Sequence, residues 1–153
     1  MQFLRMAMAL EDVLLCHGTP ERDGEYLLED VSRSGLSLAS PERIRSKVSS
    51  TAPAILCAHS HIPRFVQLDE GTVVMNPGSI GLQAYYDAEH EFPHAMETGS
   101  PHARYALLEK GNHGWQATFR AVVYDWGAAA RRAFEKARPD WAHALATGYA
   151  LRP

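Results

Sequence analysis

The chain has 153 residues, of which 46% are hydrophobic and 22% charged, a composition typical of one soluble domain with its own core. A net charge of −3 and the lack of a basic run argue against a nucleic-acid footprint. Residues 1–10 lack an apolar core of signal-peptide length, and no apolar run in the sequence is long enough to cross a bilayer. We therefore expect a cytoplasmic protein without membrane contact.

The first element expected from the sequence is a short buried strand. Within Asp12–Pro20, an apolar run leads into His17, and glycine and proline then break it. Apolar residues near helical spacing predict a short helix over 21–31. A second helix is expected to begin at Ser40, a suitable N-cap followed by proline, and to run to about Ser50.

The segment Ile55–Arg64 has the same construction as the first strand. Its apolar run ends in His59 and His61, and Pro63 follows. Strand side chains alternate, which predicts that both histidines leave the backbone on the same side. The intervening helix would serve as a crossover, which makes the two strands parallel neighbours. We therefore expect His17, His59 and His61 to meet at one edge of the sheet, where open sheets bind ligands.

Imidazoles gathered at a strand edge suit borderline divalent metals such as zinc, manganese or iron. An isolated His-x-His pair is also compatible with two solvent-facing loop histidines, and the second strand of this kind favours a metal centre. Cys16 and Cys57 each lie in an apolar run and are interpreted as small buried residues in a reducing compartment. Ligation of a metal by Cys57 stays open as an alternative.

The second half of the chain predicts further hairpins and helices. Residues 64–69 and 72–75 alternate as a hairpin that ends in the turn Asn76–Gly81. Residues 82–102 show no sustained period, which predicts a long loop suited to substrate selection. Strands over 104–109 and 115–124 should then be joined by a turn at 111–114. Two helices are expected to follow, the first over 126–137 after Asp125 as N-cap, and the second ending at Gly148.

Three stretches in order, His17–Pro20, His59–Arg64 and Asn76–Gly81, resemble motifs of the calcineurin-like metallophosphoesterases, in particular their small prokaryotic phosphodiesterase-type branch. Residues 101–107 and 124–126 also resemble the end of such proteins. The resemblance implies an α/β fold, namely the C-terminal part of a two-sheet α-β-β-α sandwich, formed by residues 1–153 as a single domain. It also implies a metal-dependent phosphoester hydrolase that acts on a phosphate-bearing small molecule.

The family site holds two divalent ions from the set Mn, Fe, Zn, Ni and Mg, and the resemblance assigns roles to residues here. His17 and His59 resemble ligands of one metal, and His61 resembles a ligand of the other. Asn76 and Ser79, in a turn near the metals in the family, are candidates for a supporting role. Arg64 could offer a planar donor fork to a phosphate, although a solvated or structural arginine is an equal alternative.

The sequence departs from the family pattern in one respect. The family supplies D-x-H, G-D and G-N-H-[DE] motifs before the first of these histidines, and this sequence has none there. Gly111–Gly114 mimics the third motif but follows the histidine pair, where it predicts a hairpin turn. Without a bridging aspartate we expect at most one weak site, which would favour zinc, and poor activity of this chain alone. The alternative is a non-catalytic module that pairs with itself, or with a separate amino-terminal half, through an open sheet edge.

Overall fold

The structure is a computed structural model that describes residues 6–153. Residues 1–5, part of the stretch expected not to be a signal peptide, lie outside the described residues. The described chain forms one five-stranded sheet and three two-stranded sheets, with three helices. None of the helices in this part of the chain is long and apolar enough to cross a membrane.

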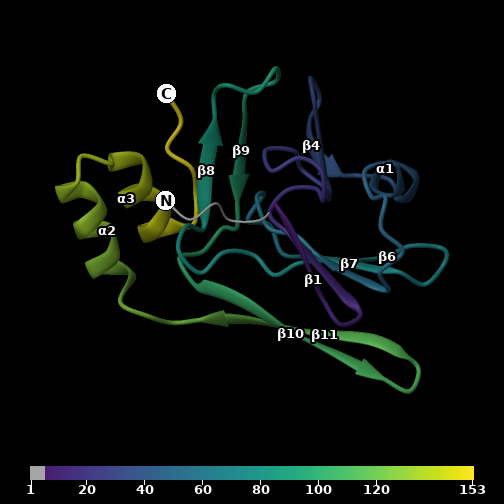
Figure 1. Cartoon of the computed structure of the whole chain (residues 1–153). Helices are drawn as coiled ribbons and strands as arrows, with labels where there is room; N and C mark the ends of the chain where they lie inside the picture. Colours follow the sequence, from purple (N-terminus) through teal and green to yellow (C-terminus); the bar gives the residue numbers. More distant parts are fainter. Residues whose placement is uncertain (1–5) are drawn as a thin grey trace.

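The five-stranded sheet positions the histidine segments (Figure 1). Its parallel centre, in which both neighbouring pairs run in the same direction, confirms the predicted pairing of the two histidine strands. The two outer strands pair antiparallel to this centre. In spatial order the strands are β1 (Ala7–Leu10), β2 (Val13–Cys16), β5 (Ala54–Leu56), β7 (Val73–Asn76) and β6 (Arg64–Gln67).

One face of this sheet carries the larger core. Helix α1 (Pro41–Ser46) contributes Ile44, which is fully buried, and thereby serves as the predicted crossover element. Its N-cap is Ser40 as predicted, but the helix ends at Ser46 and not near Ser50. The buried members of this core are Leu27, Leu28, Ala39, Ile44, Val48, Ile55, Cys57, Leu68 and Val74.

The helix predicted over 21–31 is wrong. The chain turns after Thr19 and then forms β3 (Glu29–Ser32), which pairs with β4 (Gly35–Leu38) as a hairpin. Residues 26–29 are buried consecutively, whereas an amphipathic helix would bury only one stripe. Gly35 adopts a φ of 111°, which favours glycine and places the turn at this point.

The long loop predicted over 82–102 is also wrong, because it contains a hairpin of β8 (Ala84–Asp87) and β9 (His94–Glu97). The Asp87 side chain closes the turn, since its Oδ1 accepts hydrogen bonds at 3.1 Å from the backbone N–H groups of Glu89 and His90. This hairpin stands beside the β3–β4 region in Figure 1.

The last hairpin and the terminal helices follow the prediction closely. Strands β10 (Ala103–Gly111) and β11 (Gly114–Val122) pair along their full length, with the predicted turn at their tip. Helices α2 (Trp126–Glu135) and α3 (Pro139–Thr147) pack beside each other, and α3 contacts β8. The β10–β11 pair forms a sheet of its own, so the sandwich arrangement stays a prediction.

Candidate functional site

His17 and His59 lie together at the carboxyl-terminal edge of the central strands, as the sequence predicted. Each follows one of the parallel strands β2 and β5, whose last paired residues are Leu15 and Leu56. The backbone N–H of Ala58 donates to the His17 carbonyl at 2.7 Å and ties the two strand ends together. Their ring centroids are 5.1 Å apart, with His17 exposed and His59 half-buried.

The backbone that carries His59 and His61 is not a strand, so the argument from alternating side chains is wrong. β5 ends at Leu56, and both histidines adopt positive φ values, 53° and 60°. The left-handed region is unfavourable for a residue with a side chain, so neighbouring contacts must hold this loop in place. The loop leads through Pro63 into β6.

Burial favours the neutral form of His59 and His61. It lowers the pKa of His59, and the nearby His17 ring lowers it further, against the opposing effect of a backbone hydrogen bond with Gly24. Burial likewise lowers the pKa of His61, against the opposing effect of a backbone hydrogen bond with Leu82, and His59 and His17 lower it by smaller amounts. Both rings therefore favour the neutral form, which is the form that binds metals. The buried Nδ1 of His61 has no hydrogen-bond partner among the described residues.

Two tyrosines surround the histidine loop. The ring of Tyr26 stacks on that of His59, with centroids 4.6 Å apart and an angle of 20° between the planes. The Tyr85 hydroxyl lies 3.0 Å from the His59 carbonyl oxygen, and the edge of its ring meets His61 at 5.2 Å. Burial raises the pKa of Tyr26 to about 12 and raises that of Tyr85 even further. Both hydroxyls are protonated at neutral pH and can act as donors.

Four groups around the histidine loop, Tyr26, Tyr85, Asp87 and His94, were absent from the predicted site. Besides Tyr85, the β8–β9 hairpin supplies Asp87 and His94, which contact the Tyr26 hydroxyl at 3.3 Å and 3.2 Å. Their approach depends on a hairpin that the sequence analysis interpreted as a loop. The signal that could have revealed it is the pair of aromatic residues Tyr85 and Tyr86, which favours a strand.

Asn76 is fully buried beneath the histidine loop at the end of β7. Its Nδ2 donates to the Ala58 carbonyl and, at 3.1 Å, to the Ser60 hydroxyl. Its Oδ1 accepts a 2.9 Å hydrogen bond from the backbone N–H of Gly78. Ser79 lies in the same turn, where its hydroxyl accepts from the Leu82 N–H at 3.1 Å. The structure thus places Asn76 under the loop and gives Ser79 a bond within the turn.

Arg64 directs its guanidinium to Glu29. Nε donates to Oε1 and Nη2 donates to Oε2, both at 3.0 Å, and the Glu29 side chain is completely buried. A buried carboxylate requires such a partner. These two donors are therefore occupied within the protein.

The thiols agree with the expectation that they are small core groups. Cys57 is buried in the larger core, and Cys16 packs against the same core; both are free cysteines. Burial raises the pKa of Cys16 to about 11, and it also raises that of Cys57. The neutral thiol, which is a poor metal ligand, is therefore the stable form of both.

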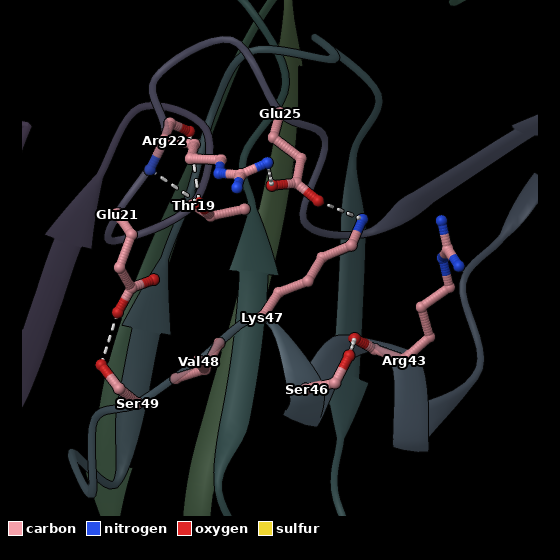
Figure 2. Close-up of a pocket in the computed structure, with 9 residues that line it drawn as sticks. All are labelled: Thr19, Glu21, Arg22, Glu25, Arg43, Ser46, Lys47, Val48 and Ser49. Atoms are coloured by element: carbon pink, nitrogen blue, oxygen red, sulfur yellow. Dashed lines mark hydrogen bonds and ion pairs between the residues drawn. The ribbon is translucent and has the colours of Figure 1, made fainter.

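An open pocket of about 510 Å³ lies beside the loop that follows His17 (Figure 2). Three cationic side chains line it, Arg22 from the loop and Arg43 and Lys47 from the last turn and C-cap of α1, together with the carboxylates of Glu21 and Glu25. Lys47 is the most enclosed of them, with 11% of its side chain exposed. Its Nζ donates to the Tyr26 carbonyl at 2.6 Å and lies 3.5 Å from Glu25 Oε1.

The fit of these residues to a metal is partial. Two adjacent imidazoles and the unpartnered Nδ1 of His61 suit a borderline cation. However, residues 6–153 contain no group of three or more His, Cys, Asp or Glu side chains arranged to hold one. The described residues alone therefore do not form the two-metal centre that the resemblance implies.

Comparison with known proteins identifies solved structures with a similar fold. No family model and no curated protein matches the chain. Its structure is similar to that of a metallophosphoesterase from Sphaerobacter thermophilus, with a TM-score of 0.66, 20% identity, and coverage of 95% of this chain and 58% of the other. It is also similar to a hypothetical protein from Pyrococcus horikoshii OT3, with a TM-score of 0.60, 18% identity, and coverage of 91% of this chain and 47% of the other.

These identities establish the fold alone. The chain has a mixed α/β fold like that of metallophosphoesterases, which confirms the predicted fold class and the resemblance in fold. It spans 58% and 47% of the length of these two structures.

Proposed function

We propose, from this metallophosphoesterase-like fold, that the chain supplies the histidine ligands of a metal-dependent phosphoester hydrolase site. The observation that carries the proposal is the 5.1 Å approach of the His17 and His59 rings at the carboxyl edge of two parallel strands. His61 follows in the same loop with a buried, unpartnered Nδ1 within the described structure. We propose His17 and His59 as ligands of one divalent ion and His61 as a ligand of a second.

The chain's own contribution would be to hold and orient neutral imidazoles. His17 is exposed and can meet an incoming ion, whereas His59 is half-buried and stacked on Tyr26, which fixes its plane. Divalent metals bound there would polarise a phosphate ester and lower the pKa of an attacking water. The carboxylates that bridge such ions would come from a segment beyond residues 6–153 or from another chain, because the described residues hold no complete ligand set.

The substrate class is a phosphate-bearing small molecule. The pocket in Figure 2 begins at Thr19, two positions after His17, and its cations Arg22, Arg43 and Lys47 are the candidate partners of an anionic part of such a molecule. Such an anion would compete with the pairs that Arg22 and Lys47 form with Glu25 and that Arg43 forms with Asp30. Within this proposal, Ser79 and the remaining N–H groups of Arg64 are candidate contacts, and Asn76 supports the histidine loop from below. The free cysteines agree with a cytoplasmic location.

The test is zinc binding by the purified chain, measured by calorimetry. We expect His17→Ala and His59→Ala each to weaken zinc binding at least tenfold, while His113→Ala, at the exposed tip of β10–β11, leaves it unchanged. Equal affinity in all three variants would contradict the assignment. With added manganese we expect only slow hydrolysis of p-nitrophenyl phosphate esters by this chain, and rapid hydrolysis would contradict the need for further ligands.

One observation favours a second candidate, a non-catalytic module that pairs with itself or with a separate partner. β1 is an outer strand of the five-stranded sheet, and its side chains Met8 and Leu10 are 50% and 59% exposed. An apolar outer strand is a template for pairing with another chain. Mass measurement in solution tests this candidate: a dimer that Met8→Lys dissociates would support self-pairing, and a strict monomer would contradict it.

A further inference from the structure

The histidine loop is held in an unfavourable backbone conformation by residues outside it. His59 and His61 both adopt φ values near those of a left-handed helix, where a side chain costs energy. Such a conformation persists only when surrounding contacts fix it. Two such contacts come from Tyr26 and Tyr85, which belong to two different parts of the chain.

Tyr85 acts on both histidines at once. Its hydroxyl donates to the His59 carbonyl at 3.0 Å, and its ring edge meets the His61 ring at a centroid distance of 5.2 Å. The carbonyl contact fixes the peptide that follows the strained residue, and the ring contact limits the rotation of the His61 imidazole. A phenyl ring at this position would retain the ring contact and lose the carbonyl contact.

Tyr26 fixes the plane of the first ring and links the loop to the β8–β9 hairpin. Its ring stacks on His59, while its hydroxyl lies 3.0 Å from that of Tyr85. The same hydroxyl contacts Asp87 Oδ2 at 3.3 Å and His94 Nε2 at 3.2 Å. His94 is itself anchored, since its Nδ1 lies 2.9 Å from the Phe92 carbonyl. The hydroxyl therefore has neighbours from both strands of the hairpin.

We propose that Tyr26 and Tyr85 are positioning residues, which set the orientation of the His59 and His61 imidazoles for a divalent cation. The inference rests on the proposed function, because it assigns these tyrosines to the same site. The carbonyl contact, the stacking contact and the hairpin bonds form one connected network, so that the β8–β9 hairpin holds the imidazoles through the two phenols. Groups that orient metal-binding histidines typically alter metal affinity by 10–100-fold when they are removed.

The test compares Tyr85→Phe and Tyr26→Phe with Tyr86→Phe. Tyr86 is the next residue on β8, and its side chain packs against a separate core of Ala84, Ala144 and Ala150. The imidazole signals of each metal-free variant are recorded by NMR, and zinc affinity and the melting temperature are then measured. We expect the His59 and His61 signals to shift and zinc affinity to fall about tenfold in both test variants. The Tyr86→Phe control should show neither change.

A purely structural role for the tyrosines would give a different result. The melting temperature would fall, while the His59 and His61 signals and the zinc affinity would stay at their native values; that outcome would overturn the proposal. His113 and His143 serve as internal references, because neither belongs to the network. If the native chain shows no zinc binding, the proposed function fails, and the ring signals of the metal-free variants still decide whether the tyrosines orient the imidazoles.

Discussion

Arg64 and Glu29 join two different sheets through a two-point ion pair. Arg64 lies in β6 of the five-stranded sheet and Glu29 in β3 of the β3–β4 hairpin, and both of their N–O distances are 3.0 Å. Burial raises the pKa of Glu29 even though Arg64 acts to lower it. The energetic cost of removing the carboxylate from water is thus only partly offset by the arginine.

Replacing Arg64 with methionine should leave this carboxylate buried without its partner. We expect a loss of about 3 kcal/mol in the free energy of unfolding at pH 7. The substitution removes the influences that lower the pKa of Glu29, so its pKa in the folded state rises further above that of the unfolded chain. A carboxyl group whose pKa is higher in the folded state stabilises that state fully when the pH is below its pKa in the unfolded chain. This contribution to stability is lost as the pH rises through the pKa in the folded state.

The stability deficit of Arg64→Met should therefore shrink as pH falls from 7 toward 5. Urea denaturation at several pH values measures it. In the control, Glu29→Gln added to Arg64→Met should remove this part of the pH dependence. A deficit that is independent of pH in the single variant would contradict the interpretation.

Gly18→Ala should destabilise the loop that follows His17. A Cβ at position 18 would lie 2.4–2.7 Å from the backbone carbonyl oxygens of Arg22, Asp23 and Glu25, so the backbone must move. We expect a loss of about 2 kcal/mol in the free energy of unfolding. Gly24→Ala is the matched control in the same loop, because a Cβ there meets nothing within 4 Å. Similar unfolding curves for the two variants would count against a close approach at Gly18.

Asn76→Ala should loosen the support beneath the histidine loop. The substitution removes the donor to the Ala58 carbonyl and the acceptor for the Gly78 N–H at a fully buried position. We expect a loss of about 2 kcal/mol, measured by chemical denaturation. Asn112→Ala, in the exposed turn between β10 and β11, should change stability by less than about 0.5 kcal/mol. An unchanged midpoint for Asn76→Ala would show that the amide does not hold the loop.

Asp125→Ala should weaken the start of α2. The Asp125 side chain caps this helix by accepting a 2.9 Å hydrogen bond from the backbone N–H of Ala128. The loss should be about 1 kcal/mol, and Asp125→Asn should recover most of it, since asparagine caps nearly as well. Thermal unfolding followed by circular dichroism compares the three proteins. Equal melting temperatures for Asp125→Ala and the native chain would contradict a capping role.

The sequence alone predicted those parts of the fold that depend on local signals. The alternation in β6–β7 and β10–β11, the caps at Ser40 and Asp125, and the stop at Gly148 are each encoded within a few residues. The segments 21–31 and 82–102 failed, because they are stabilised by contacts with distant parts of the chain. Tyr26, for example, bonds to Asp87, which lies 61 positions later.

The approach of His17 to His59 was predicted from the sequence, whereas the backbone conformation of the histidine loop was not. The order of strand and then histidine brought His17 and His59 to one edge, as the pairing of β2 with β5 confirms. The argument that placed His61 beside His59 by strand alternation was wrong. The strand β5 ends at Leu56, and both histidines that follow have a left-handed backbone conformation. No local sequence pattern predicts a positive φ at these two histidines. Tyr85 and Asn76, which contact this loop, belong to elements distant in the sequence.

The order of strands β5, β7 and β6 constrains the histidine loop further. Because β7 lies between the strands that the loop connects, residues 57–63 must cross the end of β7. Asn76, the last residue of β7, bonds to this loop from below. The loop begins at the end of β5 and ends at the start of β6, and both strands pair with β7. The distance that the loop spans therefore cannot change without breaking the register of the sheet. The sheet therefore restricts the number of residues in this loop, in addition to whatever restricts its side chains.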